Sequence, residues 1–256
     1  MGDLRVKKKK GSNKKKHGSV SVTAIKFLPK ELQVEIFAKV ATRSVFDHCM
    51  IKLCCKEFLR AAEDNYVYRH ASMENFALVP LPWFKGNNKE FSFLKRCRES
   101  GNSEILYREG MVQYFTSSME LGLKNLKEAA LEGHHDAKYV YCMLLMCGED
   151  ELGERKQGFD LFCSLASSTS LVRCRKRVKS FVGTMWLNNK PVVPNRKSCF
   201  CGSGTSDSER LKKLSRSLRW SSFEDIKDDG SIGISCQRCA AYHELGLFCN
   251  MFGVLS

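Results

Sequence analysis

The fold is decided by residues 28–58, which begin with LPKELQVEIFAKV at positions 28–40 and end with IKLCCKEF at positions 51–58. One set of apolar residues recurs at every fourth position and predicts the stripe of an amphipathic helix: Leu28, Leu32, Ile36 and Val40. Pro29 suits the first turn of that helix, because its φ is already near the helical value and its missing N–H would have no partner there.

A second helix is predicted to begin after Ser44, whose side chain can cap the helix while Asp47 stands three residues later. Its apolar positions are Val45, Phe46, Met50, Leu53 and Phe58. Two or three short helices in roughly forty residues cannot close a hydrophobic core by themselves, so their apolar faces need a partner. That partner is either the rest of this chain, as in a helical hairpin inside a larger domain, or another protein.

Leu-Pro-x-Glu-Leu at residues 28–32, followed by Cys-Lys-x-aromatic at residues 55–58, resembles an F-box. Val40 and Cys54 stand where the family usually has Leu and Val, and the middle of the motif is a few residues longer than in compact members. The resemblance implies docking on the Skp-type adaptor of a cullin ubiquitin ligase. Carried over position by position, the docking surface and its direct support would comprise Leu28, Pro29, Leu32, Ile36, Val40, Leu53, Cys55 and Phe58.

The chain of 256 residues carries a net charge of +14, and more than half of it lies at the N-terminus. Residues 1–27 hold nine Lys or Arg against one acid, Asp3, which gives +8. We expect residues 1–25 to be a disordered, solvated tail. Its lysine runs at positions 7–10 and 14–16 are similar to a nuclear import signal, although a tail that only adds solubility has the same composition.

Membrane and secreted proteins are not expected from this sequence. No apolar segment fits a secretory signal, and the longest apolar run, from Tyr139 to Cys147, is far shorter than the roughly twenty residues that cross a bilayer. Hydrophobic residues make up 43% of the chain and charged residues 27%, which is ordinary for a globular protein. We therefore expect a protein of the nucleus, the cytoplasm or both.

A domain boundary is predicted at PLPWFKGNN, residues 80–88, because prolines, a glycine and paired asparagines punctuate the chain there. It separates an F-box over residues 26–75 from a helical region over residues 90–185.

Within the helical region lies a weak repeat. GLxxLxxAA at residues 122–130 returns 36 residues later as GFxxFxxLA at residues 158–166. A period in the mid-thirties with paired helices is typical of stacked helix-turn-helix repeats. The segment AALEGHHDA at residues 129–137 looks like the joint of Sel-type tetratricopeptide-like repeats, where a glycine ends the first helix. A plain helical bundle with coincidental spacing is the alternative.

Thirteen cysteines in a chain without a secretory signal argue against a disulfide framework. The spacing Cys-x-x-Cys near the C-terminus lets two thiolates occupy two corners of a zinc tetrahedron. Residues 195–253 are therefore predicted to form a small cysteine-rich module that binds zinc through Cys199, Cys201, Cys236 and Cys239. A local ligand set replaces the first two cysteines by His243 and Cys249. Thiols that bind no metal are the remaining possibility.

Together these features predict a mainly α-helical chain made of a short F-box, a repeat-like helical region and the cysteine-rich module. This order is similar to a plant-type group of F-box proteins with Sel-like repeats and a cysteine-rich C-terminal segment. The resemblance implies a substrate-recognition adaptor and not an enzyme. The F-box would bind the Skp-type subunit and through it a cullin scaffold, and the C-terminal region would bind an unknown protein substrate.

The competing function is that of a nuclear nucleic-acid-binding protein, built from the lysine tail, a basic stretch at residues 171–198 and the zinc module. Charge favours it, but the sequence contains no recognised nucleic-acid motif.

Overall fold

The computed structural model describes residues 25–76, 89–148, 153–166, 171–191 and 236–253, and all regular structure within these ranges is helical, without a strand. The mainly α fold class is thereby confirmed. No helix in this part of the chain is both long and apolar enough to cross a membrane. The helices are α2 (Lys30–Arg43), α3 (Val45–Cys54), α4 (Lys56–Ala62), α5 (Asn65–Arg69), α6 (Lys89–Glu99), α7 (Ser103–Thr116), α8 (Met119–Leu131), α9 (His135–Cys147), α10 (Glu154–Ala166), α11 (Leu171–Val182) and α13 (Gln237–Asn250).

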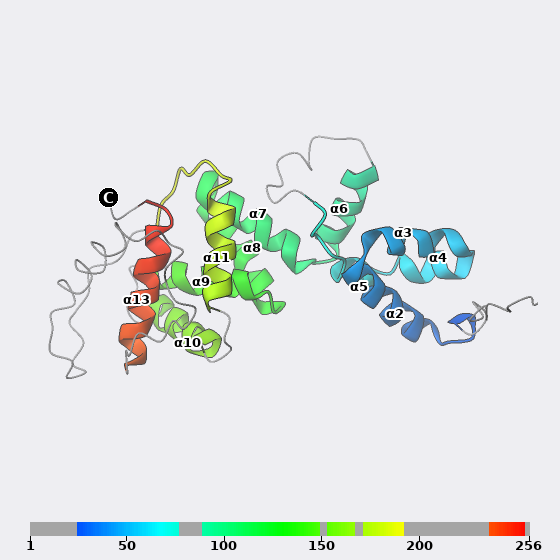
Figure 1. Cartoon of the computed structure of the whole chain (residues 1–256), viewed down its shortest axis with the longest axis horizontal. Coiled ribbons are helices and arrows are strands. Elements are labelled where there is room, and N and C mark those ends of the chain that lie inside the picture. Colours follow the sequence, from blue (N-terminus) through cyan, green and yellow to red (C-terminus); the bar gives the residue numbers. More distant parts are fainter. Residues whose placement is uncertain (1–24, 77–88, 149–152, 167–170, 192–235, 254–256) are drawn as a thin grey trace, which may run out of the picture.

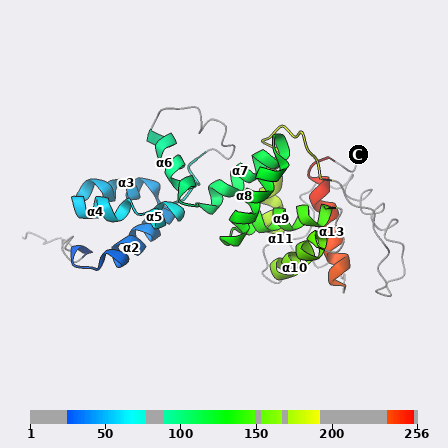
Figure 2. The same ribbon diagram turned by 180° about the vertical axis from the view of Figure 1, so that it is seen from behind.

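The molecule is elongated and has two lobes (Figure 1). Helices α2 to α5 form the N-terminal lobe at one end, and α7 to α11 together with α13 form the repeat lobe at the other. Helix α6 stands between them, and the view from behind in Figure 2 shows the same separation.

Local signals account for the helices of the N-terminal lobe. The Ser44 hydroxyl accepts a hydrogen bond from the backbone N–H of Asp47 at 3.1 Å, so the predicted cap does begin α3. Pro29 stands at the N-cap of α2, one position before the helix and not within its first turn. The lobe has one core, to which α6 and α7 also contribute: Val34, Phe37, Ala38, Ala41, Phe58, Ala61, Ala62, Val67, Tyr68, Ala71, Met73, Leu94, Cys97 and Ile105.

The predicted repeat corresponds to two helical hairpins, α7 with α8 and α9 with α10. A Cβ added at Gly122 would lie 2.2 Å from the backbone N of Tyr114, and one at Gly158 would lie 2.8 Å from the carbonyl oxygen of Cys142. In each hairpin the second helix therefore approaches the first so closely that glycine is needed. Gly133 ends α8 with φ of +87°, a conformation that favours glycine.

The C-terminal helix α13 belongs to the core of the repeat lobe. It packs on α9 and α10, and its side chains Leu245 and Phe248 are fully buried. The carboxylate of Glu244 accepts two hydrogen bonds from Arg175 of α11, at 2.9 and 2.6 Å, and one from the Tyr139 hydroxyl of α9, at 2.8 Å. The place of α13 in the core of the repeat lobe differs from the expectation that residues 195–253 form a separate module.

Helix α7 joins the two lobes. Its residue Ile105 lies in the core of the N-terminal lobe, while Leu106 lies in the core of the repeat lobe. The side-chain amide of Asn102, just before α7, donates to the carbonyl oxygens of Tyr68 at 3.1 Å and Ala71 at 2.9 Å. Because this amide is buried, the bonds fix how α7 leaves the N-terminal lobe.

Candidate functional site

The N-terminal lobe exposes many large apolar side chains. We name as its apolar surface the exposed members Phe27, Leu32, Ile36, Phe46, Met50, Leu53, Leu59 and Tyr66. Leu53 is 78% exposed, Phe46 71% and Leu32 47%. So much apolar surface on one small lobe is typical of a site that binds another protein.

The eight residues predicted for docking divide by burial. Pro29, Leu32, Ile36 and Leu53 are exposed. Leu28, Val40 and Cys55 are half-buried. Phe58 is buried and packs edge-on against Phe37, with ring centroids 5.2 Å apart. It can therefore only support the surface from beneath, which is the second role that the prediction allowed.

Sequence reasoning assigned only Leu53 of a second apolar stripe, on α3, to the docking surface and left out Phe46 and Met50. Phe46, Met50 and Leu53 follow one another at spacings of four and three residues and so share one helix face, and all three are exposed. The sequence carried the signal, since these positions were identified as the apolar face of this helix. Their exposure depends on which other helices cover that face, and no local pattern contains that information.

Polar contacts inside the lobe hold α3 in place beneath this stripe. His48 is buried, and its Nε2 lies 3.0 Å from the carbonyl oxygen of Ala62 in α4. Burial lowers the pKa of His48, so the ring is neutral at pH 7. The Lys52 ammonium bridges the Glu63 carboxylate at 2.8 Å and the Tyr68 hydroxyl at 2.5 Å.

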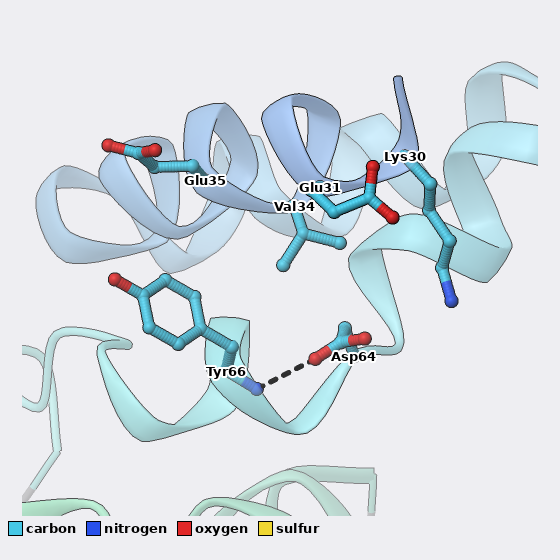
Figure 3. Close-up of a pocket in the computed structure, with 6 residues that line it drawn as sticks. All are labelled: Lys30, Glu31, Val34, Glu35, Asp64 and Tyr66. Carbon is cyan, nitrogen blue, oxygen red and sulfur yellow. Dashed lines mark hydrogen bonds between the residues drawn. The ribbon is translucent and has the colours of Figure 1, made fainter. Parts of the chain in front are cut away.

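A hollow of about 300 Å³ lies between α2 and α5 (Figure 3). Val34 and the Tyr66 ring face one another across it, and three carboxylates and one ammonium line its rim: Glu31, Glu35, Asp64 and Lys30. Glu31 and Glu35 directly precede Leu32 and Ile36 along α2. Tyr66 belongs both to the apolar surface and to the lining of this hollow, so the apolar surface borders a charged rim, an arrangement typical of protein interfaces.

The repeat lobe has a cavity of about 270 Å³ where α7, the joint between α8 and α9, and α11 meet. It is lined by Ser103, Glu132, Gly133, His134, His135, Asp136, Arg173, Cys174 and Arg177. Both signs of charge are present on its walls. Such walls can bind a polar segment that itself carries charged side chains.

His134 organises the side of this cavity next to α7. Its Nδ1 accepts the backbone N–H of Ala137 at 3.1 Å and caps α9. Because that nitrogen carries no proton, the ring proton is on Nε2, which donates to Glu104 at 2.7 Å. One histidine therefore both caps α9 and binds the half-buried carboxylate of Glu104.

The described part of the chain does not assemble a full set of the candidate zinc ligands. Cys236 and Cys239 lie at the start of α13, whereas Cys249 lies at its other end in the core, with its sulfur 3.9 Å from that of Cys147. No group of three or more His, Cys, Asp or Glu side chains within the described ranges is placed to hold a metal ion. The local set with His243 and Cys249 is therefore not assembled. Cys199 and Cys201 lie outside the described residues.

Comparisons with known proteins agree with this architecture. A family model for plant tetratrico peptide repeats matches residues 76–183. A putative F-box protein of Arabidopsis thaliana is 31% identical over 216 residues, which cover 78% of this chain and 69% of the relative. A second F-box protein of the same plant is 30% identical over 137 residues, 53% of this chain and 82% of the relative. No solved structure matches.

Proposed function

Because the chain belongs to the F-box protein family, we propose that it is the substrate-recognition adaptor of a Skp–cullin–F-box ubiquitin ligase. The observation that carries the proposal is the apolar surface of the N-terminal lobe. Fully burying side chains such as Leu32, Phe46 and Leu53 on a partner stabilises a complex by about 1.5–3 kcal/mol each. A Skp-type subunit with an apolar groove is the partner that the family suggests.

In this role the chain supplies position, and other subunits of the complex carry out the chemistry. The joint between the lobes supports such a role. The guanidinium of Arg108 in α7 donates to the carbonyl oxygens of Met73 and Phe76, each at 3.1 Å. With the two bonds of Asn102, these contacts hold the repeat lobe at a fixed angle to the N-terminal lobe.

Substrate binding belongs, in this proposal, to the repeat lobe, and its mixed-charge cavity is the candidate contact. Arg173 is exposed at the wall of the cavity. A protein segment with both acidic and basic side chains is the class of substrate that such walls complement.

A pull-down of the tagged full chain from plant extract tests the proposed function. We expect a Skp-type adaptor and a cullin to co-purify, and we expect both to be lost when Ile36 is replaced by Asp. Recovery of the two subunits with the wild type and the Ile36→Asp variant alike would contradict docking through this surface, and recovery of neither would contradict the function.

Binding of single-stranded nucleic acid is the second candidate, and one observation favours it. Trp186 is 93% exposed just after α11, whose exposed face carries the basic side chains Arg173, Lys176, Arg177 and Lys179. An exposed ring beside cations can stack on a base while the cations follow phosphates. Arg177, however, is already paired with Asp136 at 2.9 Å. A gel shift that persists at physiological salt and is lost with Trp186→Ala would support this function.

Zinc binding through Cys199, Cys201, Cys236 and Cys239 is a further part of the proposal. Four thiolates would close the chain between residues 201 and 236 and stabilise it. We expect about one equivalent of zinc in the purified full chain, loss of that metal in Cys239→Ser, and its retention in Cys249→Ser, since Cys249 faces Cys147. Metal analysis of the three proteins checks this, and a metal-free wild type that takes up no added zinc would contradict it.

A further inference from the structure

Two cysteines that are distant in the sequence meet at the edge of the repeat lobe. Cys147 is the last residue of α9, and Cys249 lies in the last turn of α13. They are 102 residues apart in the chain, and their sulfur atoms are 3.9 Å apart. Cys249 is fully buried, whereas Cys147 is partly exposed. One thiol of the pair can therefore meet a solute, and the other lies directly behind it.

We propose that Cys147 and Cys249 are an oxidation site, at which a peroxide converts two neighbouring thiols into a disulfide that locks α13 onto α9. This proposal does not rest on the proposed function, because it concerns only the repeat lobe. It also removes Cys249 from the candidate zinc ligands, for a reason based on its own contacts.

The chemistry needs only the two thiols and the peroxide. The Cys147 thiolate attacks one peroxide oxygen, the O–O bond breaks, and hydroxide leaves while Cys147 becomes a sulfenic acid. The Cys249 sulfur then attacks the sulfenic sulfur, the S–O bond breaks, and water leaves with the Cys249 proton. The two thiols lose two electrons in total, and one peroxide is reduced to two molecules of water.

The surroundings of Cys147 set how fast this oxidation can be. The hydrogen bond with Cys249 and burial raise the pKa of Cys147, while the positive charge of Arg155 acts in the opposite direction. The guanidinium of Arg155 is held at this end of α9 by a 2.5 Å bond to the carbonyl oxygen of Gly148. Little thiolate is present at neutral pH, so the pair should respond to sustained oxidation and not to brief exposure.

Closure requires a small local movement. The sulfur atoms must approach from 3.9 Å to the bond length of about 2.05 Å, which rotation of the partly exposed Cys147 side chain and a slight shift of the helix end can provide. A bond across 102 residues restricts the unfolded chain strongly. The oxidised protein should therefore melt roughly 5 °C or more above the reduced protein.

Peptide mass spectrometry of the full chain tests the proposal. The reduced protein is exposed to hydrogen peroxide for hours, remaining thiols are alkylated, and the protein is digested. We expect a cross-linked peptide pair containing Cys147 and Cys249, two hydrogens lighter than the separate peptides, that disappears after reduction. The rise in melting temperature should accompany it.

Single substitutions identify the pair. Cys147→Ser and Cys249→Ser should each abolish the cross-link and the rise in melting temperature. Cys163→Ser is the matched control, because Cys163 also lies near α13, with its sulfur 4.0 Å from the Gln237 side chain, and this variant should behave like the wild type. The proposal is overturned if Cys147 and Cys249 remain reduced while other cysteines oxidise, or if Cys249 cross-links mainly to another cysteine. Because the wild-type peptide map decides this, a variant that fails to fold does not obscure the result.

Discussion

At the scale of single residues, Glu104 at the start of α7 is a charge held by two side chains of the repeat lobe. Its carboxylate accepts hydrogen bonds from Arg108 at 2.6 Å and from His134 at 2.7 Å. Burial alone would raise the pKa of Glu104, but the bond from His134 and the positive charge of Arg108 lower it to about 2. The ionised form therefore stabilises the fold at neutral pH.

The first prediction concerns this carboxylate. Because the folded pKa of Glu104 is depressed from 4.5 to about 2, its stabilisation is complete above pH 4.5 and disappears as the pH falls through 2. Glu104→Gln should lower the free energy of unfolding at pH 7 by roughly 3 kcal/mol. The loss should be smaller at pH 3. Urea unfolding at both pH values measures it, with the exposed Glu120→Gln as a control that should change little. An equal loss at pH 7 and pH 3 would contradict the charge assignment.

At the scale of elements, each hairpin of the repeat lobe depends on a glycine in its second helix. At Gly122 the atoms that an added Cβ would meet belong to the backbone and Cβ of Tyr114, and none lies at the flexible end of a side chain. The two helices would have to separate to accept even a methyl group. The same holds less strongly at Gly158, where the nearest atom is the Cys142 carbonyl oxygen.

We therefore predict that Gly122→Ala destabilises the protein by about 2 kcal/mol or more, through forced separation of α7 and α8. Gly183→Ala is the matched control, because its nearest neighbours lie at 3.5 and 3.6 Å, an ordinary contact distance. That variant should stay within about 0.5 kcal/mol of the wild type. Thermal unfolding measures the melting temperatures of both variants. Equal melting temperatures would contradict the claim that the close approach of α7 and α8 requires glycine at position 122.

Local signals in the sequence predicted several features of the helices, but not how distant helices pack. The Ser44 cap and the spacing of the two repeat glycines are local signals, and the structure contains both. Of the predicted stripe, Leu32, Ile36 and Val40 lie in α2, whereas Leu28 precedes the helix. The place of α13 in the repeat core, and with it the meeting of Cys147 and Cys249, depends on packing between segments 102 residues apart. No periodicity or motif encodes such a contact. The exposure of Phe46 likewise depends on how the other helices pack, which no local pattern encodes.

At the scale of the whole molecule, the N-terminal lobe and the repeat lobe are distinct in space but share α7. An adaptor needs this combination, because its two partners must be bound at separate sites and held at a fixed distance. The chain also carries its +8 charge at one end, in residues 1–27. Of these residues, only 25–27 lie within the described ranges.

We predict that the lysine runs of this N-terminal segment direct nuclear import. Deleting residues 1–17 from a fluorescent fusion should shift it from the nucleus to the cytoplasm, since both runs are removed. Deleting residues 254–256 at the other end is a control that should leave the nuclear signal unchanged. Live-cell imaging measures the ratio of the two compartments. If this ratio is the same with and without residues 1–17, the charge has no role in import.

The central claim is that the apolar surface docks a Skp-type adaptor, and a titration of that adaptor into the purified full chain tests it most directly. Leu53→Asp places a carboxylate in the proposed interface, where it would be buried without a partner, and should weaken binding by about 100-fold or more. Leu131→Asp is the matched control, because Leu131 is 77% exposed, as Leu53 is 78% exposed, but lies in the repeat lobe. We expect wild-type affinity for Leu131→Asp. If both variants are folded and Leu53→Asp binds the adaptor as tightly as Leu131→Asp, this surface is not the docking site.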